Sequence, residues 1–326
     1  MNDARPVRIL AIDGGGIRGI VPATMLVELQ RRLPRPIVEY FDVVAGTSTG
    51  GLVASAVCAP APSGGPHYTP QQILEFYVRD GRQIFHRSLG WTVASLGGLR
   101  RPKYPARGID AFLVDRFGDT ELRHALKPLV LVSYDLTLRA PWVFSSVLAA
   151  EEASRNYLLR DACRASTAAP TYFPAATVRS LAGDSRELVD GGVCANDPVL
   201  AAFVVAERLY PGRPLALVSL GTGNFTHPID GAAAKRWGLG GWAWRLLDLF
   251  SDGQSAMSEA TTRRLLGAAA RDGSRYYRVQ PDLPAGLGRM DDTSDENLAG
   301  LERVTREHCT RHAAQLDEIA TSLLSG

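Results

Sequence analysis

Ser48 is the residue of this chain best placed to act as a nucleophile. It is the centre of Gly46-Thr47-Ser48-Thr49-Gly50, a Gly-x-Ser-x-Gly pattern between a short apolar run and a run of small and apolar residues. Between a strand and a helix, this pattern makes a sharp turn that presents the serine at the helix N-terminus, where the helix dipole favours negative charge. Turns of this composition also occur without chemistry, so catalysis requires an oxyanion hole and a base as well.

A glycine-rich turn that could bind an anion lies upstream, in the run DGGGIRG at residues 13–19. Consecutive N–H groups at Gly14, Gly15 and Gly16 could converge on the oxyanion of a tetrahedral intermediate. Arg18, one turn further on, would add positive potential or brace the loop. Together the two turns suggest acyl transfer.

The same glycines satisfy G-x-G-x-x-G, the dinucleotide-binding fingerprint, which is the rival interpretation. A Rossmann unit needs an acidic residue at the end of its second strand, about 20 residues on, to hold the ribose. Here that strand ends in the serine turn, and the nearest acid, Asp42, lies at its beginning. We therefore favour an oxyanion hole. A dinucleotide-binding module or a storage protein with a vestigial site is the non-enzymatic alternative.

Asp190 is a better candidate for the general base than any histidine of the chain. None of the six histidines stands where a triad member is expected; they are His67, His86, His124, His227, His308 and His312. The last two are one helical turn apart and could bind a metal, but a solvated helix face is favoured. Asp190 ends an apolar strand and precedes Gly191 and Gly192. A carboxylate is a weaker base than imidazole, yet it can serve in a dry site with a strong oxyanion hole. The alternative for Asp-Gly-Gly is a simple turn.

Composition excludes several classes of function. The formal charge of +2 gives no bulk electrostatic reason to expect a nucleic-acid polymer as partner. The four cysteines are widely spaced and fit a reducing compartment better than a disulfide framework or a zinc site; they are Cys58, Cys163, Cys194 and Cys309. A first strand at about Val7 leaves no room for a signal peptide, and no apolar run approaches ~20 residues. We expect a cytoplasmic protein.

The pattern of apolar residues predicts an α/β fold with a mostly parallel sheet covered on both faces. Strands are expected at 7–12, 43–46, 128–134, 142–146, near 190 and at 215–220. Helices are expected at 19–33, 50–59, 70–84, 108–117, 156–167, 197–209 and 295–324, and a surface loop at 88–108. One domain should span 1–326, with a catalytic core at about 7–222 and a helical segment at about 237–326 packed on it.

The segment 237–250 concentrates three tryptophans, Trp237, Trp242 and Trp244, with leucines and a phenylalanine. Such a segment could enter a lipid interface with its tryptophans at headgroup depth. An ordinary core helix is the interpretation that we favour.

In their order along the chain these motifs resemble the patatin-like phospholipases, lipid acyl hydrolases with a Ser–Asp dyad on a three-layer α/β sandwich. The run 13–19 is similar to the family's oxyanion-hole motif, 46–50 to its nucleophile elbow, and Asp190-Gly191 to its Asp-Gly dipeptide. Residues 164–174, RASTAAPTYFP, resemble the segment that precedes the catalytic aspartate. The resemblance implies Ser48 as nucleophile, Asp190 as base, and no metal or cofactor.

The resemblance also implies a phospholipid or another fatty-acyl ester as substrate, with peripheral contact at the inner face of a membrane. Within enzymes the alternative is an esterase, thioesterase or lysophospholipase acting on smaller substrates. Some similar proteins are effectors of bacterial anti-phage signalling switched on by a cyclic nucleotide, and the scattered arginines are compatible with such an activator. The segments 86–106 and 228–256 match less well, so headgroup, acyl position and oligomeric state stay open.

Overall fold

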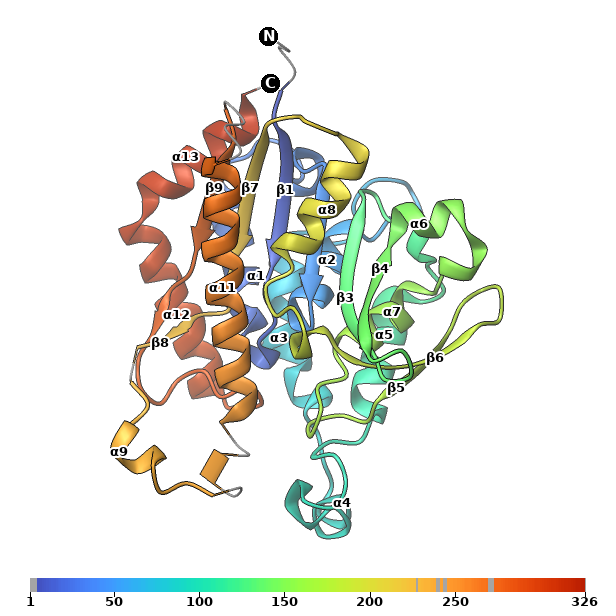
Figure 1. The fold of residues 1–326 in the computed structure, drawn as a ribbon, viewed down its shortest axis with the longest axis vertical. Helices are drawn as coiled ribbons and strands as arrows, with labels where there is room; N and C mark the ends of the chain where they lie inside the picture. The colour runs from blue at the N-terminus through green and yellow to red at the C-terminus, as the bar shows by residue number, and fades with distance from the viewer. Residues whose placement is uncertain (1–4, 227, 239–240, 243–244, 269–272, 326) are drawn as a thin grey trace.

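The computed structural model describes residues 5–226, 228–238, 241–242, 245–268 and 273–325, and an eight-stranded sheet lies at its centre (Figure 1). The strands follow the order β5 (Ala176–Arg179), β6 (Ser185–Asp190), β3 (Leu129–Asp135), β2 (Val43–Thr47), β1 (Val7–Ile12), β7 (Leu215–Leu220) and β9 (Arg275–Val279). β4 (Ala140–Ser145) also pairs with β3, and β8 (Asn224–Phe225) pairs separately with β10 (Asp282–Leu283).

The sheet is parallel in the half that carries the two glycine turns. β1 pairs in parallel with β2 and β7, β2 pairs in parallel with β3, and β7 with β9. β4 and β6 pair antiparallel with β3, and β5 pairs antiparallel with β6. The carboxyl ends of β1, β2, β3 and β7 therefore lie at one edge, which is where open α/β sheets bind their ligands.

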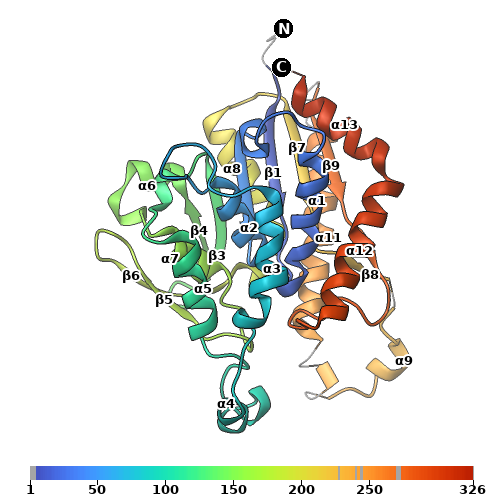
Figure 2. The ribbon, with the colours of Figure 1, turned by 180° about the vertical axis from the view of Figure 1, so that it is seen from behind.

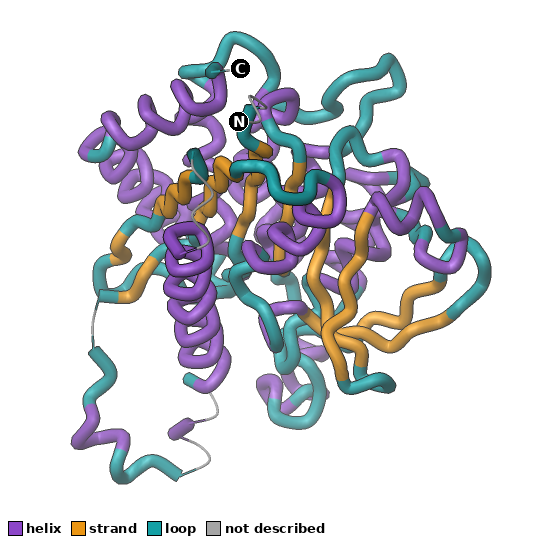
Figure 3. Tube along the Cα trace, turned by 45° about the horizontal axis from the view of Figure 1, so that its top comes forward, coloured by secondary structure: helices purple, strands orange, loops and turns teal. Residues whose placement is uncertain are grey.

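Helices cover both faces of the sheet, and the strands run between the two helical layers (Figure 3). One face carries α8 (Val199–Leu209) and α11 (Leu246–Ala268) (Figure 1). The other carries α1 (Ile20–Gln30), α2 (Thr49–Cys58), α3 (Pro70–Ile84), α5 (Arg107–Phe117), α7 (Leu159–Ser166) and α12 (Asp295–Arg311) (Figure 2). The remaining α-helices described are α4 (Leu89–Ala94), α6 (Ser146–Glu151), α9 (Gly231–Ala234) and α13 (Ala313–Leu324). The three-layer α/β architecture expected from the sequence is confirmed.

Two apolar clusters hold the layers together, because successive side chains of a strand point to opposite faces. In β1, Leu10 and Ile12 belong to the cluster under α1 and α2, whereas Val7, Ile9 and Ala11 belong to the cluster under α8. Every residue of β1 is buried and all but Arg8 are apolar, which is the pattern of a strand covered on both faces.

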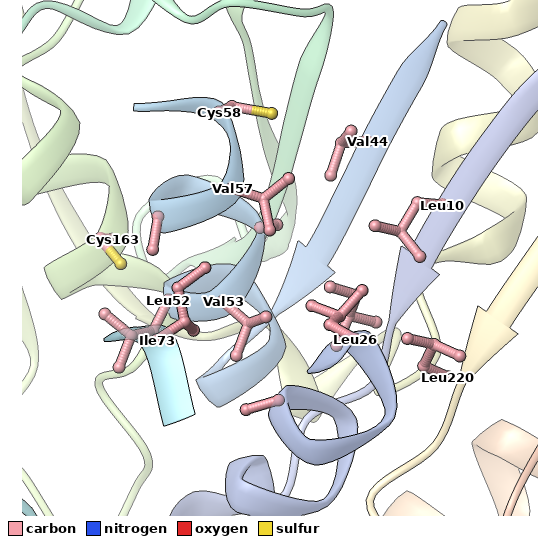
Figure 4. Close-up of a cluster of buried hydrophobic side chains, with 14 of the residues drawn as sticks. Leu10, Leu26, Val44, Leu52, Val53, Val57, Cys58, Ile73, Cys163 and Leu220 are labelled. Atoms are coloured by element: carbon pink, nitrogen blue, oxygen red, sulfur yellow. The ribbon is translucent and has the colours of Figure 1, made fainter. Parts of the chain in front are cut away.

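α2 is buried on every side, as its small and apolar sequence predicts. Figure 4 shows Leu52 beside Ile73 of α3, and Val57 on the side toward Val44 of β2. The helix that follows the serine turn is thus fixed by packing against both the sheet and its neighbouring helix.

Two segments differ from the prediction in their helices. The C-terminal segment forms two helices rather than one, because the backbone leaves the helical region at His312 (φ −108°, ψ 31°). The expected surface loop at 88–108 contains α4, which begins at a Ser88 cap whose Oγ accepts from the Trp91 N–H at 3.1 Å. Neither β5 nor β9 was expected.

The segment 237–250 is not a core helix over its described residues. α11 begins only at Leu246, and Phe250 is 55% exposed. Trp237 and Trp242 pack edge to face with ring centroids 5.2 Å apart, and both side chains are only half-buried. Trp244 lies outside the described residues. Within the described ranges, no helix combines the length and apolar character needed to cross a bilayer.

Gly50 marks the closest approach of α2 to β1 and gives a test of this packing. A Cβ at Gly50 would lie 2.1 Å from the Ile12 carbonyl oxygen. We expect Gly50→Ala to lower the free energy of unfolding by about 3 kcal/mol, because the two backbones must move apart. Gly253→Ala is the control: Gly253 is exposed in α11, and a Cβ there meets no atom within 4 Å. Urea unfolding of both variants measures the difference, and a Gly50→Ala protein as stable as the control would contradict the close approach.

Candidate active site

The pairing of β3 brings Ser48 and Asp190 together. β2 pairs in parallel with β3 as far as Thr47 opposite Val132. β6 pairs antiparallel with the continuation of β3, and its last residue, Asp190, lies opposite Ser133. The two strands therefore run toward one another along β3 and end at neighbouring positions. Ser48 and Asp190, 142 residues apart in sequence, meet where these strands end.

The turn at Ser48 has the strained backbone expected of a nucleophile elbow. Ser48 adopts φ 54° and ψ −125°, a left-handed φ that L-residues rarely adopt. Gly46 permits the turn, since a Cβ there would lie 2.2 Å from the Gly50 carbonyl oxygen. The Thr47 hydroxyl donates to the Ala195 carbonyl at 2.8 Å, and the Thr49 hydroxyl lies 2.6 Å from that of Tyr77. The side chains of the flanking residues thus tie the turn to neighbouring segments.

Ser48 and Asp190 form a hydrogen-bonded pair. The Ser48 Oγ donates to Asp190 Oδ2 at 2.5 Å, and the Gly192 N–H donates to Asp190 Oδ1 at 2.7 Å. Asp190 is only 4% exposed. Burial raises the pKa of this carboxyl to about 7, although its two hydrogen bonds favour the ionised form. A carboxylate with this pKa is a much better proton acceptor near neutral pH than an exposed aspartate.

Ser166 holds the backbone of Ser48 through a hydrogen bond. Its Oγ accepts from the Ser48 N–H at 3.0 Å and donates to the Val132 carbonyl at 2.7 Å. Gly191 lets the chain cross the same carbonyl, since a Cβ at Gly191 would lie 2.3 Å from it. The Ser48 N–H is therefore engaged and does not point to the oxyanion of an attacked ester.

The glycine loop offers two free N–H groups beside the nucleophile. The Gly14 N–H donates to the Asn196 carbonyl at 3.0 Å, so Gly14 does not serve as the oxyanion donor that the sequence suggested. For the N–H groups of Gly15 and Gly16, the described part of the chain supplies no hydrogen-bond acceptor. Both residues line the cavity into which Ser48 opens. Gly16 has φ +60°, and its N–H lies at the start of a short 3-10 turn, Gly16–Gly19, where N–H groups are unpaired.

Two hydrogen bonds from distant segments hold this loop in place. The Thr222 hydroxyl donates to the Gly14 carbonyl at 2.7 Å, and the Ile17 N–H donates to the Met290 carbonyl at 2.8 Å. A Cβ at Gly15 would lie 2.5 Å from the Thr222 Oγ1, and one at Gly16 would lie 2.3 Å from the Met290 oxygen. The glycines are needed because the supporting segments touch the loop backbone itself.

Arg18 points away from the cavity that contains Ser48. Its Nε donates to the Gly15 carbonyl at 3.3 Å, and its guanidinium lies 4.8 Å from the centre of the Phe225 ring. Of the two roles that the sequence suggested for Arg18, the geometry matches bracing of the loop rather than direct contact with an oxyanion. Burial lowers the pKa of Arg18 from its usual value.

A buried ion pair anchors the start of the glycine loop. Arg278 of β9 donates from Nη1 to Asp13 Oδ1 at 2.9 Å and from Nη2 to Asp13 Oδ2 at 2.6 Å, and its Nη1 also reaches the Ser219 hydroxyl at 2.7 Å. The two charged side chains are 5% and 2% exposed. A two-pronged pair of this kind fixes position as well as charge, because the guanidinium and carboxylate planes must align. It ties the loop to β7 and β9.

The cavity above Ser48 is mostly apolar and opens to solvent, with a volume of about 90 Å³. Its polar end holds Ser48, Asp190 and the glycine loop. Its walls include Leu52, Ile84, Phe85, Ile109, Phe173 and Met290. The site therefore combines the hydrogen-bonded Ser48–Asp190 pair at one end with an apolar surface at the other.

No histidine lines this cavity among the described residues. His308 and His312 stack on one another with ring centroids 4.2 Å apart, and burial is the main reason that the pKa of His308 falls to about 4. Over the ranges that the structure describes, no group of three or more His, Cys, Asp or Glu side chains could hold a metal.

Several supporting residues were not identified from the sequence. Ser166 lies in the run 164–174, which was noticed for its resemblance, so a signal for it was present but no role followed from it. Asn196 lies six residues after Asp190, beyond the Asp-Gly dipeptide that drew attention. Thr222 follows a predicted strand in a Gly-Thr-Gly turn, which is a weaker signal. No sequence pattern singled out Arg278 or Met290, because each supports the glycine loop through a contact with a residue more than 260 positions earlier in the chain.

Comparison with known proteins agrees with this geometry. The family model described as patatin-like phospholipase matches residues 10–203, which include the glycine loop, the serine turn and Asp190. Patatin-like protein 2 of Oryza sativa subsp. indica is 31% identical over 348 residues, covering 95% of this chain and 85% of that protein. Patatin-like protein 4 of Arabidopsis thaliana is 32% identical over 331 residues, covering 91% and 82%. Patatin-08 of Solanum tuberosum is 31% identical over 326 residues, also covering 91% and 82%.

Two solved structures show a distant likeness. VipD from Legionella pneumophila has a TM-score of 0.36 and 13% identity, covering 94% of this chain and 67% of that one. The type III effector protein ExoU has a TM-score of 0.42 and 12% identity, covering 96% and 54%. The match of the family model over more than half of the chain, with relatives above 30% identity along nearly all of it, shows that the chain belongs to the patatin-like phospholipase family.

Proposed function

We propose that this chain is a metal-independent phospholipase of the A type, with Ser48 as nucleophile and Asp190 as general base. Family membership supports hydrolysis of lipid acyl esters. The observation that carries the finer assignment is the 2.5 Å hydrogen bond from Ser48 Oγ to the buried Asp190 carboxylate at the polar end of an apolar cavity. A nucleophile and its base within hydrogen-bond reach are the minimal unit of covalent acyl transfer.

The first half of the reaction acylates the enzyme. Asp190 takes the proton of the Ser48 hydroxyl as Oγ attacks the ester carbonyl carbon, whose oxygen becomes an oxyanion. Gly15 and Gly16 line the cavity, and their N–H groups, which have no acceptor in the described part of the chain, stabilise that charge. When the tetrahedral intermediate collapses, the C–O bond to the glycerol breaks and the leaving alkoxide takes the proton from Asp190. A lysophospholipid departs and the fatty acyl group stays on Ser48.

The second half restores the enzyme. Water enters, Asp190 takes one of its protons, and the hydroxyl oxygen attacks the acyl carbon. The same glycine N–H groups stabilise the second oxyanion. The bond to Ser48 Oγ then breaks, Oγ takes the proton back from Asp190, and a fatty acid is released. No step needs a charged group beyond Asp190.

The cavity supports a fatty-acyl ester as the substrate. Each methylene taken from water into an apolar wall contributes about 0.8 kcal/mol to binding, so a long acyl chain gains much from the apolar walls above Ser48. The headgroup would then lie toward solvent. An esterase or thioesterase that acts on small substrates is the competing activity, and the products distinguish the two.

Removing either member of the Ser48–Asp190 pair should abolish hydrolysis. We expect Ser48→Ala and Asp190→Asn each to reduce the rate about a thousandfold or more, since nucleophile and base act as a unit. Mass spectrometry of a mixed phospholipid substrate should show fatty acid and lysophospholipid from the wild type, with or without EDTA. A fluorophosphonate should label the wild type but not Ser48→Ala.

The exposed serine variant Ser185→Ala is the control for this experiment and should retain full labelling and activity. Retained hydrolysis in Ser48→Ala would refute the nucleophile. Hydrolysis of short esters without any release of fatty acid from phospholipids would favour the small-substrate esterase instead.

The rate should depend on pH through Asp190. A base acts only when ionised, so kcat/KM should rise with pH and level off above an apparent pKa of about 7. Asp197→Asn serves as the control, because Asp197 is also buried with its pKa raised to about 7 but makes no hydrogen bond to Ser48. We expect the same pH profile in that variant. A wild-type rate independent of pH between 5 and 8 would contradict Asp190 as the base.

The buried base should also reduce stability at high pH. The pKa of Asp190 is higher in the folded protein than its usual value, so ionisation favours the unfolded chain. The contribution of the Asp190 carboxyl to the free energy of unfolding is therefore present at low pH and is lost as the pH rises from about 4 to about 7. We expect Asp190→Asn to raise the melting temperature by a few degrees at pH 8 and by less at pH 5. Calorimetry at both values tests this, and an equal shift at both would contradict it.

A further inference from the structure

The segment from Gly81 to Ile109 stands apart in charge and in exposure. It contains six arginines and lysines but no aspartate or glutamate, although the whole chain carries only +2. Its central part projects as α4 and the following turn beyond the main body of the molecule (Figures 1 and 2). In this projection four large apolar side chains, which we call the apolar tip, are exposed: Leu89 by 88%, Val93 by 75%, Leu96 by 60% and Leu99 by 81%.

Hydrogen bonds hold the apolar tip in one shape. The Trp91 Nε1 donates to the Pro102 carbonyl at 3.1 Å, and the N–H groups of Gly98 and Arg100 both donate to the Ser95 carbonyl at 3.0 Å. Leu96 adopts φ 49°, a left-handed conformation that is strained for a leucine. None of the residues of α4 is buried. Hydrogen bonds to backbone carbonyls thus fix the shape of the turn, and its leucine side chains are exposed to solvent.

The base of the projection joins the wall of the catalytic cavity. Phe85, four residues before the tip, lines that cavity and packs 5.4 Å from the ring of Tyr104. The N–H groups of Lys103 and Tyr104 donate to the carbonyls of Thr171 and Tyr172, both at 2.8 Å. The chain therefore passes from the cavity wall at Phe85 into the tip, which lies beyond the ends of β1 and β2 on the same side of the molecule (Figure 1).

Basic groups surround the apolar tip. Arg100 and Arg101 are exposed, directly follow Leu99, and have no ion-pair partner among the described residues. An apolar group of this kind alone would suit many partners. Leucines flanked by unpaired arginines fit a surface with an apolar interior below a layer of negative charge.

We propose that the apolar tip with Arg100 and Arg101 is the element by which this protein docks on an anionic phospholipid bilayer. The proposal rests on the proposed function, because docking there places the mouth of the cavity against the membrane that holds its substrate. The leucines and valine enter the acyl boundary, and the arginines bind headgroup phosphates.

Vesicle binding in a Ser48→Ala background tests docking without lipid breakdown. Vesicles of phosphatidylcholine with one-third phosphatidylglycerol should pellet this protein, and vesicles of phosphatidylcholine alone should pellet much less. Leu89→Asp/Val93→Asp should weaken binding to the anionic vesicles about tenfold or more, and Arg100→Gln/Arg101→Gln about tenfold, with the latter effect lost at high salt.

Matched control variants separate the effect of changing the tip from the effect of changing charge or polarity elsewhere on the surface. Val204→Asp replaces a valine that is 65% exposed on α8, and Arg303→Gln/Arg311→Gln removes two exposed charges from α12. Both should bind vesicles as the parent does. In the active enzyme, the tip variants should hydrolyse a water-soluble short-chain ester at the wild-type rate but lose vesicle hydrolysis in proportion to binding.

The outcomes distinguish the two proposals. Equal vesicle binding by parent and tip variants overturns the docking site, whatever the activity. Loss of short-ester hydrolysis in the tip variants also overturns it, because the tip would then be part of the fold or the catalytic site. If Ser48→Ala is a dimer that Leu89→Asp/Val93→Asp converts to a monomer, the tip binds a second copy instead. Failure of the wild type to hydrolyse any ester, with docking intact, refutes only the proposed function.

Discussion

The meeting of two strand ends on β3 is the constraint on which the candidate active site depends. β2 must stop at Thr47, where Gly46 and Gly50 turn the chain into α2, and β6 must stop at Asp190, where Gly191 crosses the Val132 carbonyl. A shift of either strand by one residue would send its terminal side chain to the other face of the sheet. Backbone pairing therefore brings Ser48 and Asp190 together, in addition to the hydrogen bond between their side chains.

Two buried carboxylates beside this junction show how charge is divided in the site. Asp13 is paired with Arg278 and supports the glycine loop, whereas Asp190 has only a hydroxyl and an N–H as hydrogen-bond donors. A cation beside Asp190 would lower its pKa and weaken it as a proton acceptor. The Arg278 guanidinium thus lies at Asp13, where it fixes the position of the glycine loop. The donors to Asp190 in the described part of the chain are neutral, which keeps the pKa of that carboxyl high. The unpaired carboxylate costs stability, as strained and unneutralised groups at functional sites commonly do.

Sequence patterns predicted the elements that local signals define and missed those that depend on distant pairing. α3 begins at Pro70, directly after the Thr69 N-cap and its full capping box, and has the predicted bounds, as β7 also does. β9 lies at the edge of the sheet, and its sequence, RYYRV, carries no continuous apolar run. The two catalytic candidates were found because glycines frame both of them. No local sequence pattern could reveal that β6 pairs with the same edge of β3 as β2 does, because this pairing depends on the register between strands that are far apart in the chain.

The support of the glycine loop explains why the site needs the C-terminal part of the chain. The family model ends at residue 203, after both Ser48 and Asp190. Yet Thr222 holds the Gly14 carbonyl, Arg278 holds Asp13, and the Met290 carbonyl accepts from Ile17. A catalytic core that ended near residue 222 would keep the nucleophile and the base but lose two of these three supports. The free N–H groups of the loop would then lack a fixed direction, and fixed direction is what gives an oxyanion hole its effect.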